Sequence, residues 1–169
     1  MRRVMACALF AAIGVATLSA CGAVVLPLVG VQLDAEGVPH VLLRPCGDDK
    51  IRGPGLQGFA GTNQAEDGGL LDGENLSGWK VPAEHAPGDV DFPLFAPPSQ
   101  WAAVQVGDQD LRADLTYQIS FGKAEFNYEY TGLVTFRLTD IDALELGQVW
   151  ADGRSMTREA FEELAEESC

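Results

Sequence analysis

Apolar and polar residues alternate with a period of two along residues 111–138, the most regular part of the chain. Odd positions are apolar from Leu111 to Phe121, and apolar side chains fall mainly on even positions from Ala124 onward. A period of two is typical of a β-strand with one buried face, and Gly122-Lys123, where the parity changes, suits a two-residue type II′ turn. We therefore predict a tight hairpin with four apolar pairs: Phe121 with Ala124, Ile119 with Phe126, Tyr117 with Tyr128 and Leu115 with Tyr130.

A second hairpin is predicted near the N-terminus. Residues 29–33 and 38–46 are two extended apolar runs joined by turn residues that end in Gly37, which we expect in the left-handed conformation. Pro39 and Pro45 have no amide hydrogen to donate, so the second run is expected to be an edge strand or a bulged one.

Residues 47–100 contain ten Gly and six Pro and show little periodicity. They predict a Gly/Pro-rich loop region in which only residues 76–81, with Trp79, and residues 91–95 have the character of strands. Loops of this length are often functional.

The C-terminal part predicts a strand and a helix. A kink or a new strand is expected near Gly132, residues 140–142 are expected to form a turn, and residues 146–151 a last strand. A helix is predicted at about 157–168 with Thr157 as its N-cap. Its apolar face would comprise Phe161, Leu164, Ala165 and Cys169.

Together these elements predict a mainly β protein, a small immunoglobulin-like antiparallel β-sandwich with one C-terminal helix. About seven short strands separated by turn residues are typical of that architecture. The cysteine and tryptophan spacing of antibody domains is absent, so the prediction concerns the architecture alone. The domain would occupy residues 29–169.

The N-terminus has the order of a secretory signal. Arg2 and Arg3 are followed by an uncharged apolar run at 4–17, then by Leu18-Ser19-Ala20 before Cys21. This pattern resembles the lipobox of bacterial lipoproteins, in which the cysteine thiol receives a diacylglycerol before the signal peptide is cut off in front of it. Two acyl chains hold a protein stably to a bilayer.

The resemblance implies that residues 1–20 are a signal peptide, that Cys21 is lipidated and that residues 21–28 form a short tether. One alternative is an uncleaved transmembrane helix over residues 4–29, which exceeds the ~20 residues needed to span a bilayer. Another is export by a twin-arginine signal at the paired arginines. All three place residues 30 onward outside the cytoplasm.

As a whole, the chain resembles uncharacterised secreted lipoproteins of high-GC Gram-positive bacteria. The resemblance rests on the lipobox at Cys21, on the opening hairpin that ends in Pro45-Cys46, and on the closing segment that ends in Cys169. It implies a location, lipid-anchored at the outer face of the cell membrane, and no activity.

Two cysteines remain after Cys7 is assigned to the signal peptide and Cys21 to the lipid. In an exported protein, Cys46 and Cys169 predict a disulfide. Two free thiols, or a bond to another chain, are the alternatives.

The net charge of −14 excludes some partners. Without residues 1–20 the chain has 9 basic and 25 acidic residues, a net charge of −16. Nucleic acids and anionic membrane surfaces bind clusters of Lys and Arg, so we expect no nucleic-acid partner.

No motif predicts catalytic, cofactor-binding or metal-binding residues. The sequence from Gly53 to Gly58 matches G-x-G-x-x-G, but no helical pattern follows it, so we interpret it as a glycine-rich loop. A zinc site would have to use both His40 and His85 together with a carboxylate, but the two are predicted on a strand and in a Pro-rich loop, so we interpret each as a hydrogen-bonded or exposed histidine. The acidic residues at 108–110 and 140–142 lack the remaining ligands of a calcium loop and are interpreted as turns.

The sequence therefore favours a non-enzymatic binding or structural module. Its partners would be the lipid bilayer, through diacylated Cys21, and an envelope protein, wall polymer or small ligand bound by loops in 47–100. The alternative is a cell-envelope hydrolase that uses carboxylates of the same region. A pocket facing a carboxylate of perturbed pKa would favour the enzyme, whereas an exposed aromatic patch around Trp79 or Trp101 would favour the binding module.

Overall fold

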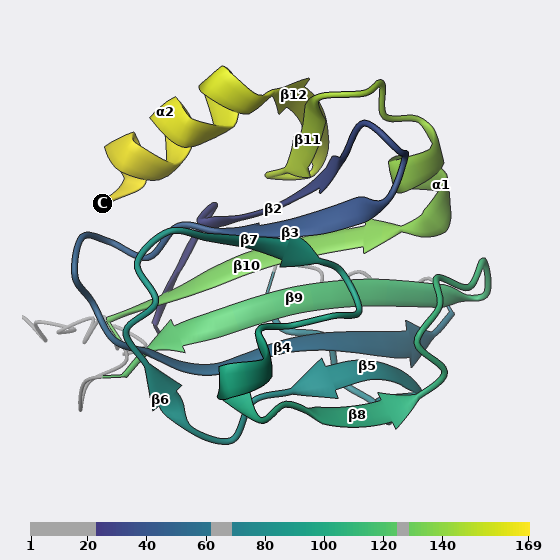
Figure 1. Cartoon of the computed structure of the whole chain (residues 1–169), viewed down its shortest axis with the longest axis horizontal. Helices are drawn as coiled ribbons and strands as arrows, with labels where there is room; N and C mark the ends of the chain where they lie inside the picture. Colours follow the sequence, from purple (N-terminus) through teal and green to yellow (C-terminus); the bar gives the residue numbers. More distant parts are fainter. Residues whose placement is uncertain (1–22, 62–68, 125–128) are drawn as a thin grey trace, which may run out of the picture.

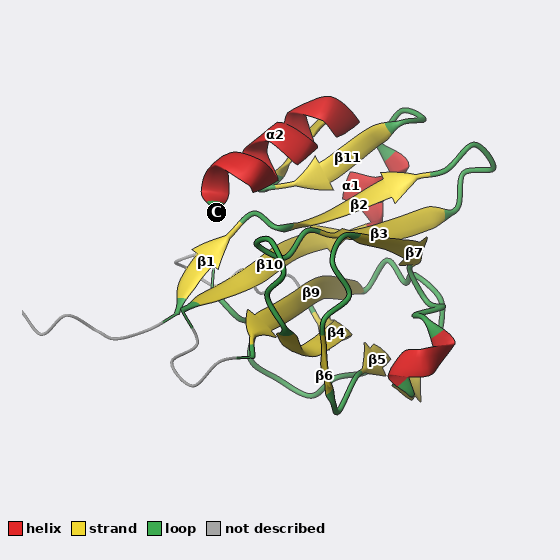
Figure 2. Ribbon diagram, turned by 60° about the vertical axis from the view of Figure 1, so that its left-hand side comes forward, coloured by secondary structure: helices red, strands yellow, loops and turns green. Residues whose placement is uncertain are grey.

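The computed structural model describes residues 23–61, 69–124 and 129–169, and it shows two β-sheets packed face to face with a helix on the outside (Figures 1 and 2). The larger sheet has the order β1 (Val24–Leu26), β10 (Tyr130–Arg137), β9 (Leu115–Lys123), β4 (Ile51–Ala60), β5 (Ser77–Lys80), β8 (Val104–Gly107), and β6 (Glu84–His85) also pairs with β4. The smaller sheet has the order β12 (Arg154–Thr157), β11 (Gln148–Ala151), β2 (Val29–Leu33), β3 (Pro39–Leu43), β7 (Val90–Pro93). The helical segments are η1 (Ser99–Trp101), α1 (Leu138–Asp142) and α2 (Arg158–Ser168). The predicted mainly β sandwich with a C-terminal helix is confirmed.

The smaller sheet buries both of its faces. Val31 and Val41 point into the main core, where they meet large side chains of the larger sheet such as Tyr117. Side chains at the alternate positions of these strands face the other way. Among them, Leu42 packs against Phe161 of α2. Alternation along each strand thus divides the apolar side chains between the sandwich interior and the helix.

The tight hairpin predicted at Gly122-Lys123 is wrong, because both residues belong to β9. Strand β10 pairs with β9 in a register that sets Gly132 opposite Phe121, Val134 opposite Ile119 and Phe136 opposite Tyr117. This register is displaced by eight positions from the predicted one. An even displacement keeps the same side chains on the buried face, so the alternation alone does not distinguish the two registers. The predicted partners Phe126 and Tyr128 lie outside the described residues.

Of the kink or new strand expected near Gly132, the structure shows a new strand, because β10 begins at Tyr130 and continues through Gly132. A Cβ atom at Gly132 would lie 2.4 Å from Cε1 of Phe121, whose ring covers the glycine. The glycine therefore provides room for an aromatic ring from the neighbouring strand.

The opening hairpin is confirmed, with Gly37 at φ +80°. Its second strand, β3, is not an edge strand, because it lies between β2 and β7. Pro39 is the first residue of β3 and Pro45 follows its end, so neither proline removes a hydrogen bond from the middle of the ladder.

Residues 47–100 contain more structure than the sequence predicts. The strands expected at 76–81 and 91–95 are present as β5 and β7, but the interpretation of Gly53 to Gly58 as a loop is wrong. These residues are part of β4, which pairs with β9 and β5 and carries a register shift between Arg52 and Gly55. At Gly58 a Cβ atom would lie 3.0 Å from the Tyr117 ring, so a side chain here would crowd the core.

At the C-terminus the strand predicted at 146–151 is present as β11, and the helix is present as α2. Thr157 caps α2 by accepting a hydrogen bond from the Ala160 amide at 3.2 Å, as predicted. The turn expected at 140–142 is instead part of α1, so the chain has a second helix. Strand β12 was not expected.

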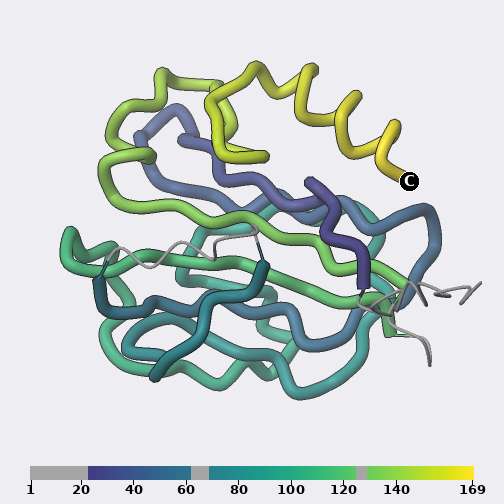
Figure 3. Tube along the Cα trace, turned by 180° about the vertical axis from the view of Figure 1, so that it is seen from behind, coloured from purple at the N-terminus to yellow at the C-terminus, as the bar shows by residue number. Residues whose placement is uncertain are grey.

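The N-terminal part of the domain begins earlier than predicted. Strand β1 starts at Val24 and pairs in parallel with β10, so part of the predicted tether at 21–28 is folded into the sheet. Figure 3 shows this segment beside β10 before the chain crosses to the other sheet. No helix among the described residues is both long and apolar enough to cross a bilayer.

Candidate functional site

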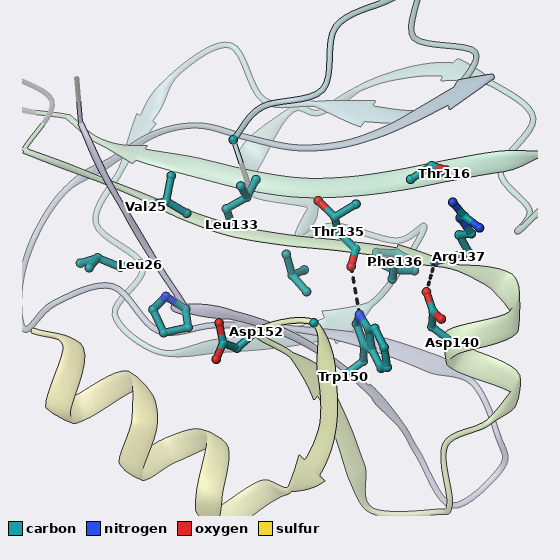
Figure 4. Close-up of a pocket in the computed structure, with 14 residues that line it drawn as sticks. Val25, Leu26, Thr116, Leu133, Thr135, Phe136, Arg137, Asp140, Trp150 and Asp152 are labelled. Atoms are coloured by element: carbon teal, nitrogen blue, oxygen red, sulfur yellow. Dashed lines mark hydrogen bonds between the residues drawn. The ribbon is translucent and has the colours of Figure 1, made fainter. Parts of the chain in front are cut away.

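The three tryptophans have different environments. Trp79 and Trp101 are 0% and 3% exposed, and the ring of Phe92 contacts both at centroid distances of 5.6 and 5.4 Å. Trp79 also donates its indole N–H to the Leu94 carbonyl at 2.7 Å. The expected exposed patch around Trp79 or Trp101 is therefore absent from the described structure. Trp150 of β11 is half-buried and lines a groove (Figure 4).

The groove has a volume of about 560 Å³ and follows the edge of β10. Strand β1 pairs only with residues 130–132 of β10, so it leaves residues 133–137 uncovered on that side. Leu133, Thr135 and Arg137 line one wall. Trp150 and the turn between β11 and β12 form the opposite wall.

Trp150 crosses from the smaller sheet to the larger one. Its indole N–H donates to the Thr135 carbonyl at 2.9 Å. That carbonyl lies on the edge of β10 beyond its pairing with β1, where no strand of the described residues supplies a donor. The hydrogen bond satisfies the carbonyl and fixes the ring at the centre of the groove.

A buried glutamine supports the groove from behind. Gln118 is 1% exposed; its side-chain amide donates to the Thr135 hydroxyl at 3.1 Å and to the Gly69 carbonyl at 3.2 Å, and it accepts from the Leu71 amide at 3.0 Å. The sequence suggests that even positions of β9 face solvent, yet Thr116 and Gln118 are buried, and they bond Gly61 and Leu71 of the segments on either side of residues 62–68. The burial of Gln118 cannot be predicted from the sequence, because its hydrogen-bond partners are 17 to 49 residues away in the chain.

The polar end of the groove is formed at the start of α1. Asp140 accepts a hydrogen bond from the Arg137 amide at 2.8 Å and so caps the start of the short helix. The carboxylate lies near the first turn, where negative charge is favoured. Arg137 and Asp140 therefore give this end charged groups. Thr116 also lies here, but it is buried and donates its hydroxyl to the Gly61 carbonyl at 2.6 Å.

The predicted disulfide between Cys46 and Cys169 is present, and it ties the end of α2 to the segment after β3. A buried arginine reinforces the same connection. Arg44 is 6% exposed, and it bonds Glu162 of α2 at 2.6 and 2.8 Å and Asp91 of β7 at 2.7 Å. These contacts hold α2 on the sheet and lie outside the groove.

The charges of this cluster stabilise one another. Burial opposes the charge on Arg44, but its hydrogen bonds with Glu162 and Asp91 raise the arginine pKa above its usual range. The hydrogen bond from Arg44 lowers the pKa of Glu162. Burial opposes ionisation of Asp91, and hydrogen bonds from Arg44 and Arg158 outweigh it and lower the pKa of Asp91. All three groups are therefore held in their charged forms.

Among the described residues of 47–100, no carboxylate lines the groove. Asp91 belongs to the Arg44 cluster, and Glu84 is bonded to Arg52, which lowers the pKa of Glu84. A general acid needs a raised pKa, which neither of these two groups has. The carboxylates that line the groove, Asp140 and Asp152, lie outside that region.

The other candidate residues are separated. His40 lies 3.2 Å from Asp34, whereas His85 stacks on Trp101 at 5.5 Å. Within residues 23–61, 69–124 and 129–169, no three His, Cys, Asp or Glu side chains come together closely enough to hold a metal ion. Cys21 and the lipobox residues before it lie outside the described residues.

Comparisons of the chain with protein-family models, with curated proteins and with solved structures found no match.

Proposed function

We propose that the chain is a lipoprotein held at the outer face of the cell membrane through diacylated Cys21, and that its domain is a non-enzymatic binding module. The groove beside Trp150 is the binding site, and an envelope component is the partner. The observation that carries the proposal is the position of this groove, which has β1 as part of its wall.

The position of β1 supports a connection between the anchor and the groove. Val24 is three residues after Cys21, and three extended residues span about 10 Å. The bilayer would therefore lie close to the end of the groove where Val25 and Leu26 form the wall.

The Cys46–Cys169 disulfide supports export, because disulfides persist in oxidising compartments. The resemblance of Leu18-Ser19-Ala20-Cys21 to a lipobox supports the anchor. The two arguments use different cysteines and are independent.

The anchor is tested by expressing the full chain in a bacterium that processes lipoproteins and labelling it with a fatty-acid analogue. We expect the label on the wild type and its loss in Cys21→Ser. Cys7→Ser is the matched control, because Cys7 belongs to the segment that would be removed, and it should be labelled like the wild type. Equal labelling of Cys21→Ser and the wild type would contradict the proposal.

A further inference from the structure

The lining of the groove changes from apolar to polar along its length. At the end beside β1 it is formed by Val25, Leu26 and Leu133, and at the other end by Thr116, Arg137 and Asp140, with Trp150 between them (Figure 4). Asp152, which the view places nearer the apolar end, is exposed on the turn after β11.

The gradient follows from the alternation in β10. Leu133, Thr135 and Arg137 are on the same face of the strand, so their side chains lie in a row that runs from apolar through hydroxyl to charged. Val25 extends the row at its apolar end, because it pairs with Thr131. Such a surface matches a molecule with an apolar tail and a polar head.

The length of the row suits an acyl chain. Six residues separate the position of Val25, opposite Thr131, from Arg137, which at 3.3 Å per residue is about 20 Å. The hydrocarbon core of a bilayer is about 30 Å thick, so the chains of one leaflet extend over roughly 15 Å. An extended acyl chain therefore fits between the apolar end and the polar groups.

The chain's attachment gives the direction of entry. On the proposed function, on which this inference rests, Cys21 holds the domain with its β1 end toward the bilayer. Val24 and Val25 are 60% and 46% exposed at that end. An acyl chain leaving the bilayer would meet this apolar surface first.

We propose that the groove binds a lipid of the membrane to which the protein is anchored, with the acyl chain along Val25, Leu133 and Trp150 and the polar head at Arg137 and Asp140. The occupant is a bilayer lipid, not the acyl chains bound to Cys21 and not an extended peptide paired with the uncovered edge of β10.

The position of Trp150 allows a direct test. The mature lipidated protein is reconstituted into phosphatidylcholine vesicles whose acyl chains carry bromine, a short-range quencher of tryptophan fluorescence. Trp79 and Trp101 are buried in the core and should keep their emission. We expect the brominated lipid to quench the emission of Trp150. The variant Trp150→Phe is the control, because it lacks this tryptophan and its remaining emission should be the same with and without bromine.

Two valine variants test whether the quenching depends on the apolar end of the groove. Val25→Glu places a charge at the apolar end of the groove, whereas Val104→Glu places one on β8, at the opposite edge of the same sheet. Both valines are exposed, at 46% and 59%, so both variants should fold. We expect Val25→Glu to abolish the quenching and Val104→Glu to keep it at the wild-type level.

The outcomes distinguish the two proposals. Protein that floats with the vesicles but keeps the emission of Trp150 would overturn the lipid site and leave the anchor, and an extended peptide or the protein's own acyl chains in the groove would give this result. Quenching that is equal in Val25→Glu and the wild type would also overturn the lipid site. Mature protein that carries no lipid and does not float with the vesicles would overturn both proposals.

Discussion

The indole N–H of Trp150 donates to the carbonyl of Thr135 at 2.9 Å and so joins the two sheets across the edge of the sandwich. The residues are 15 positions apart in sequence but lie on different sheets. This hydrogen bond gives the groove a fixed central wall, and it connects the candidate site to the stability of the fold.

We expect Trp150→Phe to lower the free energy of unfolding by about 1–2 kcal/mol, because it leaves the Thr135 carbonyl without its donor while it keeps an aromatic ring. Urea unfolding followed by circular dichroism measures the change. Unchanged stability would mean that water replaces the indole at no cost.

The disulfide should contribute more. We expect Cys46→Ser combined with Cys169→Ser to destabilise the domain by about 5 kcal/mol, because the bond closes a loop with a sequence separation of 123 residues and restricts the unfolded chain. The double variant avoids an unpaired thiol. The measurement is urea unfolding of the double variant and of the wild type under oxidising conditions, and a loss below 1 kcal/mol would contradict it.

The Arg44 cluster predicts a loss of stability in acid. The pKa values of Asp91 and Glu162 are lowered in the folded state, so their ionisation stabilises the fold above the ordinary values of 3.8 and 4.5. This stabilisation is lost as the pH falls from the ordinary pKa values through the lower pKa values of the folded state. Glu162→Gln should therefore reduce the dependence of unfolding free energy on pH below about 4.5.

Glu163→Gln is the matched control for that measurement, because Glu163 is the next residue of α2 and is exposed. Both variants lose one negative charge from the same helix. An equal change in the acid dependence of the two variants would show that the effect comes from net charge and not from the bond to Arg44.

Because Gly132 is in close contact with Phe121, the cost of replacing Gly132 should depend on the size of the side chain at position 121. Gly132→Ala should cost about 1–3 kcal/mol, because the added Cβ would lie 2.4 Å from the buried Phe121 ring. In a Phe121→Leu background the same substitution should cost much less, and the double-mutant cycle measures this coupling. Equal costs in the two backgrounds would contradict the close contact.

Much of the fold follows from local patterns. The alternation of residues 115–121 identifies β9, Gly37 identifies the first turn, and Thr157 identifies the start of α2. Each signal comes from residues that are neighbours in sequence, so it does not depend on tertiary structure. The register of β9 and β10 is not such a signal, because displacements by an even number of residues leave the buried face unchanged.

Strand β4 shows a second limit of the sequence. Its glycines remove the alternation by which strands are recognised, but Gly58 is required where the Tyr117 ring approaches the backbone. Pro54 lies within the register shift between Arg52 and Gly55, where a missing amide hydrogen is tolerated. A glycine-rich segment in a β protein is therefore not necessarily a loop.

The groove could not be predicted from the sequence, because its walls come from segments far apart in the chain. Val25, Thr135 and Trp150 belong to β1, β10 and β11, and they meet only when the two sheets pack. The one relevant signal is the tryptophan in the last predicted strand, but its position beside the edge of β10 follows only from the packing of the two sheets.

The central claim is that Cys21 becomes the lipidated first residue of the mature protein. Mass spectrometry of the intact protein purified from membranes tests it most directly. We predict a mature chain that begins at Cys21 and carries the added mass of a diacylglycerol. A chain that retains Met1, with Cys21 unmodified, would contradict the account.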